Sequence, residues 1–372
     1  MKIICLQENF KKGLNIVQNI IGKNLTLPIL NNILLDVSKN KLKLSATDLE
    51  LAVSSDIQCK SEKTGSITIP AKTLFNFVNT LPNKKIEISV KNNIINLKCE
   101  NYQSSINGLN SKDFPIIPQL KNKPILEINS NKLKEILEQV INFVSFSDIR
   151  PEINGIFFNF SLEKNSKFVT TDSFRLGEKT VSLKINKQKG SDLSSIIIPY
   201  KTAQELIRII GNQEKDENIK VIIQDNQILF TSNNFELISK LIKGNYPNYK
   251  QLITDKFETN ILIEKEELVK AIKLSSFFSS KINDVRLRIN SKKGIIEVFS
   301  QDLELGENLS KIKADIKGRD MEAIFNYKYL LDGLNSINSK KISIGFNSEV
   351  SPGIIKPEGD SSFTYVVMPI KL

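Results

Sequence analysis

Three amphipathic helical segments share one pattern of apolar and polar positions along this chain. The copies read IPAKTLFNFVNTLP at residues 69–82, IPYKTAQELIRIIG at 198–211 and, more weakly, FNYKYLLDGLNSI at 325–337. In each copy the apolar residues recur at the three- and four-residue spacing that places them on one face of an α-helix. The lysines near the start of each copy lie 129 and 127 residues apart, at Lys72, Lys201 and Lys328. This period predicts three repeats of similar build.

Further helices and strands surround each of these segments. An amphipathic helix precedes each one, at residues 10–21, 133–144 and 264–275. A strand pair follows that first helix, at 31–51, 154–177 and 285–307. More strands begin after the shared segment, at 86–106, 221–242 and 342–357. Alternation of apolar and polar residues in these runs is typical of half-buried antiparallel strands. The predicted fold class is α+β, with two helices per repeat packed on antiparallel sheets.

An apolar residue followed by proline closes each repeat, at Phe114-Pro115, Tyr246-Pro247 and Met368-Pro369. Proline has no N–H to donate to a strand ladder, so it is expected where the strand pairing ends. We therefore expect three domains, at residues 1–120, 127–251 and 252–372.

A polar residue and an aspartate end each strand pair, at Thr47-Asp48, Thr171-Asp172 and Gln301-Asp302. These carboxylates are 124 and 130 residues apart, which repeats the period of the lysines. They could be catalytic, but aspartate at the end of a strand most often accepts hydrogen bonds from the backbone of a turn. We expect a structural role for all three.

Composition limits the class of protein and its location. The 372 residues are 40% hydrophobic and 25% charged, as in a soluble globular protein. No uncharged apolar run approaches the length of a membrane span, and the opening MKIICLQENF does not resemble a secretory signal. Cys5, Cys59 and Cys99 are too widely spaced to indicate a disulfide framework or a metal site. A cytoplasmic location is expected.

The formal net charge of +11 suits a polyanionic partner such as nucleic acid. However, the lysines and asparagines are scattered along the chain, so charge alone favours a solvated lysine-rich surface over a dedicated basic patch.

The residues present exclude several classes of enzyme. The chain has no histidine, which excludes a Ser-His-Asp or Cys-His nucleophile and any histidine-ligated metal. It has neither a G-x-x-x-x-G-K-[ST] loop nor a G-x-G-x-x-G turn after a strand. A binding or scaffold protein is therefore favoured over an enzyme, and no cofactor is predicted.

Several of these stretches, taken in order, resemble the bacterial DNA polymerase III beta subunit family, the sliding clamps. The resemblance extends over essentially the whole length. The most specific stretches are TTDSFRLG at 170–177, SKLIKGNYPNY at 239–249 and the terminal YVVMPIKL at 365–372.

The resemblance implies a DNA clamp fold of three domains that pairs head to tail with a second copy into a closed ring. Helices would line a hole that encircles double-stranded DNA without regard to sequence. The clamp itself would catalyse nothing. It would act in DNA replication as a processivity factor, and would tether the DNA polymerase III alpha subunit, the clamp loader, other polymerases and repair proteins through short peptides.

The resemblance also implies three sets of site residues. The DNA-facing set comprises Lys23, Asn24, Lys72, Ser147, Arg150, Pro151, Glu152 and Lys201. The pocket for partner peptides comprises Ile153, Thr171, Phe174, Arg175, Leu176, Pro247, Leu252, Asn326, Tyr329, Val350, Val366, Met368 and Pro369. The dimer interface comprises Ser104, Ile106, Phe277 and Phe278.

Two other functions compete with this interpretation. A carboxylate-based, metal-dependent nuclease would turn over with Mg²⁺ and would lose activity when Asp48 or Asp172 is neutralised. A sequence-specific DNA-binding protein would bind short linear duplex with a base preference. The threefold repeat, which lacks a recognition-helix motif, argues against both.

Overall fold

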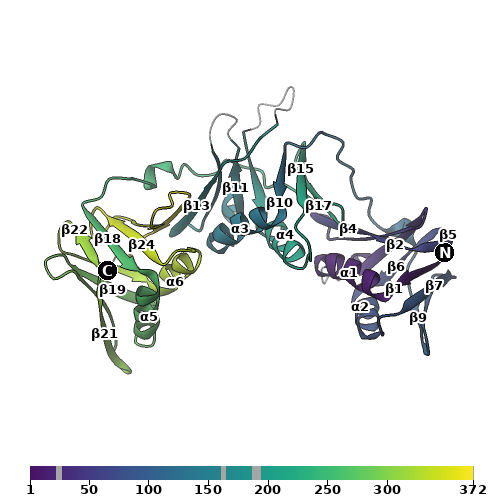
Figure 1. Cartoon of the computed structure of the whole chain (residues 1–372), viewed down its shortest axis with the longest axis horizontal. Coiled ribbons are helices and arrows are strands. Elements are labelled where there is room, and N and C mark those ends of the chain that lie inside the picture. The colour runs from purple at the N-terminus through teal and green to yellow at the C-terminus, as the bar shows by residue number, and fades with distance from the viewer. Residues whose placement is uncertain (22–26, 161–164, 187–193, 372) are drawn as a thin grey trace. The chain divides into compact units, whose positions relative to one another are not determined.

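A computed structural model describes residues 1–21, 27–160, 165–186 and 194–371 of the chain (Figure 1). All six expected helices are present in these ranges. Their bounds are α1 Gln7–Val17, α2 Ala71–Thr80, α3 Ser130–Val140, α4 Tyr200–Gly211, α5 Lys265–Ser276 and α6 Tyr327–Asn335. Contacts along the chain divide it into two compact units. Unit 1 is Met1–Leu133, Lys184–Ser191 and Gln204–Leu241, and unit 2 is Lys134–Leu183, Asp192–Ala203 and Ile242–Leu372.

These two units do not coincide with the three repeats in the sequence, since their boundaries run through α3 and α4. The units reflect the density of contacts, whereas the repeats reflect similarity of pattern. The division into domains at 1–120, 127–251 and 252–372 stays a prediction.

Unit 1 contains two antiparallel sheets. The five-stranded sheet has the order β5-β1-β7-β8-β9. Its bounds are β1 Lys2–Leu6, β5 Lys60–Lys63, β7 Lys85–Lys91, β8 Ile94–Cys99 and β9 Tyr102–Asn107. The eight-stranded sheet has the order β10-β15-β16-β17-β4-β3-β2-β6. Its bounds are β2 Asn32–Ser38, β3 Lys41–Thr47, β4 Leu51–Gln58, β6 Gly65–Pro70, β10 Leu126–Asn129, β15 Asn218–Gln224, β16 Gln227–Thr231 and β17 Glu236–Lys240.

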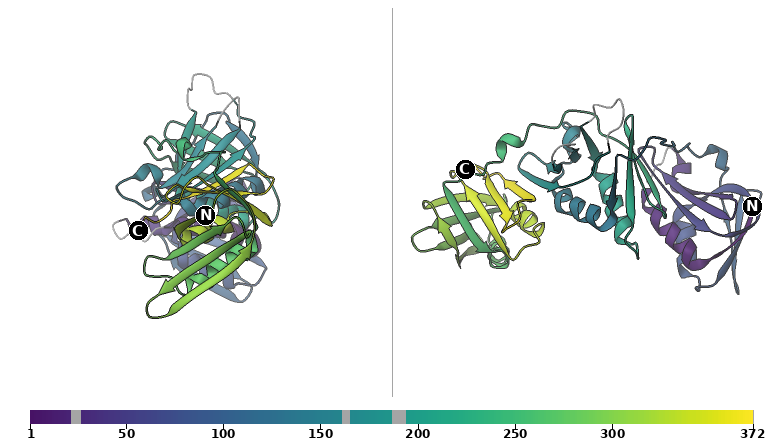
Figure 2. Two further views of the ribbon diagram at one scale, coloured as in Figure 1. Left: turned by 90° about the vertical axis from the view of Figure 1, so that its left-hand side faces the viewer. Right: turned by 45° about the horizontal axis from the view of Figure 1, so that its top comes forward.

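Unit 2 also contains two antiparallel sheets. The nine-stranded sheet has the order β14-β11-β12-β13-β26-β25-β24-β18-β22. Its bounds are β11 Gly155–Asn159, β12 Ser166–Thr171, β13 Arg175–Val181, β14 Ser195–Pro199, β18 Thr259–Glu264, β22 Asp315–Lys317, β24 Lys341–Phe346, β25 Gly353–Pro357 and β26 Phe363–Val367. The four-stranded sheet has the order β21-β20-β19-β23. Its bounds are β19 Asp284–Asn290, β20 Ile295–Asp302, β21 Gly306–Lys313 and β23 Met321–Asn326. Strands β18 and β24 pair directly and are visible side by side in green and yellow in Figure 2.

The two large sheets join strands from neighbouring repeats. In unit 1, Leu237 of β17 pairs with Val53 of β4. In unit 2, Leu176 of β13 pairs with Val366 of β26. Each large sheet is therefore continuous across a boundary between repeats.

The helices bury the apolar faces that the sequence pattern predicts. In unit 1, α1 packs against α2 and against β3 and β4, and its residues Phe10, Leu14 and Val17 are fully buried. In unit 2, α5 packs against α6 and β21, with Leu268 and Ile272 buried. Burial of such large side chains stabilises the fold by about 1.5–3 kcal/mol each. No helix among the described residues is long and apolar enough to cross a membrane.

Candidate functional site

The three aspartates at the strand ends organise turns, as expected from the sequence. Oδ1 of Asp172 accepts hydrogen bonds from the N–H groups of Phe174 and Arg175, both at 3.0 Å. Oδ1 of Asp48 accepts from the two equivalent N–H groups in the β3–β4 hairpin at 3.0 and 2.8 Å, and Oδ1 of Asp302 does so in the β20–β21 hairpin at 2.9 and 3.0 Å. Among the described residues, no group of three Cys, Asp or Glu could hold a metal ion. The geometry gives no support to a metal-dependent nuclease.

The hairpin 171–176 also carries four of the residues predicted to receive partner peptides, Thr171, Phe174, Arg175 and Leu176. The N–H of Met368 donates to the carbonyl of Phe174 at 2.8 Å, which holds the end of β26 against the tip of this hairpin. Leu176 and Val366 belong to one apolar cluster with Val169, Tyr249 and Ile354.

The residues predicted to form the peptide pocket differ in exposure. Leu176, Val366 and Ile153 are only 1–2% exposed. By contrast, Phe174 is 59% exposed and Val350 is 61% exposed. The remaining predicted residues are distributed between these extremes: Thr171 and Pro369 are buried, Pro247, Asn326, Tyr329 and Met368 are half-buried, and Leu252 is exposed. Buried apolar residues next to exposed apolar and aromatic side chains are the composition expected of a pocket for a short peptide.

Arg175 is the most extensively bonded of these side chains. Its Nε is 2.9 Å from Oδ2 of Asp172, its Nη1 pairs with Asp332 on α6, and its Nη2 donates to the carbonyl of Asn142 at 3.1 Å. Its guanidinium also lies over the ring of Tyr329. Burial alone would lower the pKa of Arg175, but the hydrogen bond to Asp332 and the charge of Asp172 outweigh it, and the pKa is raised. Arg175 therefore stays charged and links the β12–β13 hairpin to α6.

Asn326 and Tyr329 are fixed at the first turn of α6. Oδ1 of Asn326 accepts the N–H of Lys328 at 2.9 Å and so caps the helix. The carbonyl of Tyr329 accepts a hydrogen bond from the hydroxyl of Tyr365 at 2.7 Å. The centroid of the Tyr329 ring lies 6.4 Å from that of the Phe174 ring. Asp332 was not predicted from the sequence. Its partner Arg175 is 157 positions away, and no local pattern connects them.

The residues predicted to face DNA occupy helix starts and one loop. Lys72 and Lys201 are exposed, and each is the second residue of its helix, α2 or α4. Arg150 bonds to Glu152 at 3.2 Å and to the hydroxyl of Ser173 at 3.1 Å. Ser147 is half-buried, and its hydroxyl accepts the N–H of Ile149 at 3.3 Å.

Pro151 begins a short 3-10 helix that ends at Ile153. Lys23 and Asn24 lie outside the described residues.

The residues predicted at the dimer interface differ in exposure. Phe277 is 71% exposed, whereas Phe278 and Ser104 are half-buried. The side chain of Ile106 is 7% exposed and belongs to the core of unit 1, so only its backbone is available to a partner. Its strand β9 is the last strand of the five-stranded sheet, and β21 is the last strand of the four-stranded sheet.

Comparison with known proteins identifies the family. Residues 1–118, 127–248 and 250–371 match the N-terminal, central and C-terminal domains of the DNA polymerase III beta subunit. A beta sliding clamp from Synechocystis sp. is 29% identical over the full length of both chains.

Solved structures agree with this match. The DNA polymerase sliding clamp of Bacillus subtilis superposes with a TM-score of 0.93 at 25% identity, covering 100% of this chain and 99% of that one. A sliding clamp from Pseudomonas aeruginosa, solved bound to griselimycin, gives 0.92 at 25% identity and covers 100% of both chains. The chain therefore belongs to the DNA polymerase III beta subunit family, the beta sliding clamps, whose members are non-catalytic processivity subunits of the polymerase holoenzyme.

Proposed function

We propose that two copies of this chain close into a ring around duplex DNA and tether the replicative polymerase to its template. The observation that carries the proposal is the match over the whole chain, in sequence and in fold, to beta sliding clamps. Encirclement holds such a ring on DNA by topology, so it requires no strong contacts and no base readout. Its place of action would be the cytoplasm, on the nucleoid during replication.

In this proposal, lysines at helix starts meet the DNA backbone. Lys72 and Lys201 are exposed at the first turns of α2 and α4. Ammonium groups on flexible stems bind phosphates without reading sequence, and such contacts weaken as salt rises. We expect Arg150 to contribute less to DNA binding, because its guanidinium already bonds to Glu152 and Ser173. Lys23, Asn24, Ser147, Pro151 and Glu152 complete the proposed surface.

Ring closure would join β9 of one copy to β21 of the other. Both are edge strands, and an exposed edge presents unpaired N–H and C=O groups to a second strand. Phe277, together with Leu274 one turn earlier on α5, supplies exposed apolar surface for the same interface. Ser104 and Phe278 would contribute at its margin, and Ile106 would contribute only its backbone.

Partner proteins would bind the pocket between the 171–176 hairpin, β26 and α6. Its apolar floor would receive a large aliphatic or aromatic side chain of a short peptide, while Phe174, Leu252 and Val350 would close over it. The polymerase alpha subunit, the clamp loader and repair proteins are the partners we propose.

The first test is the mass in solution by light scattering over a dilution series. We expect twice the 42.1 kDa of one chain. Phe277→Asp should yield a monomer, because it replaces an exposed apolar ring of the proposed interface with a charge that would have to be buried on association. Ile149→Asp changes a residue that is also strongly exposed and serves as the control. A wild-type protein that is monomeric at every concentration would contradict ring closure.

The second test separates encirclement from ordinary DNA binding. Protein loaded onto nicked circular DNA should stay bound at high salt, and it should be released when the circle is cut. A sequence-specific DNA-binding protein would instead remain on the linear product. Retention on linear DNA with free ends would contradict the proposal.

A further inference from the structure

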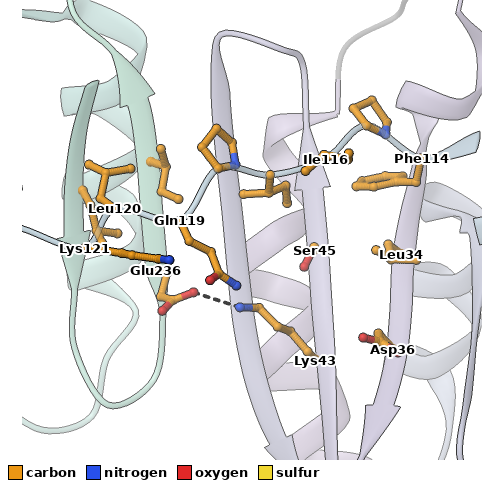
Figure 3. Close-up of a pocket in the computed structure, with 15 residues that line it drawn as sticks. Leu34, Asp36, Lys43, Ser45, Phe114, Ile116, Gln119, Leu120, Lys121 and Glu236 are labelled. Carbon is orange, nitrogen blue, oxygen red and sulfur yellow. Dashed lines mark hydrogen bonds and ion pairs between the residues drawn. The ribbon is translucent and has the colours of Figure 1, made fainter. Parts of the chain in front are cut away.

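A groove runs beneath the segment that connects the first repeat to the second (Figure 3). This connecting segment, residues 114–121, crosses the exposed face of the eight-stranded sheet. The cavity below it has a volume of about 580 Å³. The strands contribute Leu34 and Ser45 from β2 and β3, and Leu229 and Ile238 from β16 and β17. A cavity of this size is in the range of ligand sites in proteins.

Comparison of the repeats explains why the groove is open. Tyr246-Pro247-Asn248-Tyr249 in the second repeat corresponds to Phe114-Pro115-Ile116-Ile117 in the first. Tyr249 is 5% exposed and packs in the cluster with Val169. At the equivalent positions the first repeat has the smaller Ile117 and Ser45, so the volume that an aromatic ring fills in the second repeat is empty in the first.

Ser45 offers a hydroxyl to a ligand in the groove. It lines the cavity and is 4% exposed. Its hydroxyl makes no hydrogen bond with any residue that the structure describes, although the neighbouring Ser54 hydroxyl donates to Glu236 at 3.3 Å. The oxygen of this hydroxyl is reached by solvent from the groove, so a polar ligand group there can replace water as its hydrogen-bond partner.

The connecting segment itself is extended and unpaired. Within the described chain, no hydrogen bond uses the backbone N–H or C=O groups of residues 115–120. The residues at its two ends are held by hydrogen bonds. The N–H of Phe114 donates to the carbonyl of Ser111, and the N–H of Lys121 donates to the side chain of Gln224. Ile116 projects from this segment and is 95% exposed. An extended backbone with free polar groups can accept another extended chain alongside it.

The charges in the groove are balanced. Lys43 and Glu236 pair at 2.9 Å, while Asp36 and Lys121 carry one charge of each sign. Such a surface has no net attraction for a polyanion, which argues against nucleic acid as the occupant.

We propose that this groove binds an extended peptide segment of a partner protein. The segment would pair through its backbone with residues 116–120 and cover Ile116. It would place one bulky apolar side chain between Leu34, Phe114 and Ile117, with a backbone or side-chain polar group on the Ser45 hydroxyl. This site is separate from the pocket at the 171–176 hairpin, and it depends on neither ring closure nor DNA.

Selection of peptides on the full chain tests the proposal. The probe is a phage-displayed library of random 12-residue peptides, and the selected sequences are then synthesised and titrated by fluorescence polarisation. At least one should lose about tenfold or more in affinity, equal to about 1.4 kcal/mol, on Ile116→Asp and on Ser45→Leu. Ile116 is almost fully exposed, so its replacement leaves the fold intact. Ile116→Asp therefore tests the groove even if Ser45→Leu strains the sheet.

Two control variants separate this groove from other surfaces. Ile149→Asp is matched for residue type and exposure, and Val350→Asp alters the rim of the other candidate pocket. Both should leave binding of the groove-dependent peptide within about twofold of wild type. Hydrogen exchange at the N–H groups of Ile116 and Ile117 should slow when that peptide is bound, because the backbone becomes paired.

Three outcomes would overturn the proposal. The first is a library that is exhausted without a binder sensitive to Ile116→Asp. All binders could instead depend on Val350, which would assign peptide binding to the other pocket alone. Alternatively, Ile116→Asp could convert a dimer to a monomer, which would identify a second copy of this chain as the occupant.

Discussion

The guanidinium of Arg175 lies 4.4 Å from the centroid of the Tyr329 ring, although the two residues are on different elements, β13 and α6. The same guanidinium lies 5.5 Å from the ring of Phe143 and pairs with Asp172 and Asp332. One side chain thus orders both the hairpin and the helix that border the candidate peptide pocket. Its planar, permanently charged group suits paired carboxylates and stacking better than an ammonium does.

Replacement of Arg175 should destabilise unit 2. Arg175→Ala leaves Asp172 and Asp332 without their shared partner and removes the stacking on Tyr329, so we expect a loss of about 2–4 kcal/mol in the free energy of unfolding. Arg175→Lys keeps the charge but should recover only part of that loss. Urea denaturation measures both. Arg150→Ala is the control, because Arg150 is more exposed and should change stability little.

Arg208 joins α4 to the end of α1 within unit 1. Its Nη1 and Nη2 donate to the carbonyls of Asn15 and Ile16 at 2.7 and 2.8 Å, and its Nε contacts Glu205 at 2.7 Å. These carbonyls lie at the C-terminal end of a helix, where a cation is favourable. Arg208→Ala should lower the free energy of unfolding by about 1.5–3 kcal/mol.

Hydrogen exchange can locate that effect. Amides in the last turn of α1 should exchange faster in Arg208→Ala, whereas amides of α5 in unit 2 should not change. Equal acceleration in both helices would contradict a local capping role.

Asp48 should act as a hydrogen-bond acceptor rather than as a catalytic acid. Asp48→Ala removes the acceptor for two backbone N–H groups of the β3–β4 hairpin, so we expect a loss of about 1–2 kcal/mol in stability. Asp48→Asn keeps an oxygen at the same position and should be nearly neutral. Thermal unfolding followed by circular dichroism distinguishes the two variants. Equal destabilisation by both would show that the negative charge, not the turn geometry, is what matters.

Buried groups with raised pKa values should make the fold sensitive to alkali. Burial raises the pKa of the Cys5 thiol to about 12, and it also raises the pKa of the Tyr249 and Tyr365 hydroxyls. The folded state then holds protons that the unfolded state releases. The contribution of Cys5 to the free energy of unfolding is fully present below the pKa that its thiol has in the unfolded chain. It is lost as the pH rises from there toward 12, at no more than about 1.4 kcal/mol per pH unit.

A Cys5→Ala variant isolates this contribution. Its free energy of unfolding should fall less steeply between pH 9 and pH 12 than that of the wild type, and chevron or urea data at several pH values give the two slopes. Cys59→Ala is the matched control, because Cys59 is less buried. Identical slopes for wild type and Cys5→Ala would contradict the assignment.

The sequence alone determined the local elements of this protein. The spacing of apolar residues located all six helices, because a helical face requires only neighbours three and four positions apart. Alternation located the strands after each first helix and after each shared segment, but it missed β1, β10 and β18, which precede the first helices. The repeated Asp48, Asp172 and Asp302 identified turns whose hydrogen bonds close within three residues. The sequence also placed Lys72 and Lys201 correctly at helix starts, because the start of a helix depends on residues that are close in sequence.

The tertiary structure decided everything that depends on distant partners. It paired β13 with β26 and β17 with β4, and it brought Asp332 to Arg175 across 157 positions. It also decided which of the predicted pocket residues are buried and which are exposed, and it placed Ile106 in the core. The open groove beside Ser45 follows from the path of residues 114–121 over a sheet. These features arise from long-range register and packing, which a local pattern of apolar and polar residues does not encode.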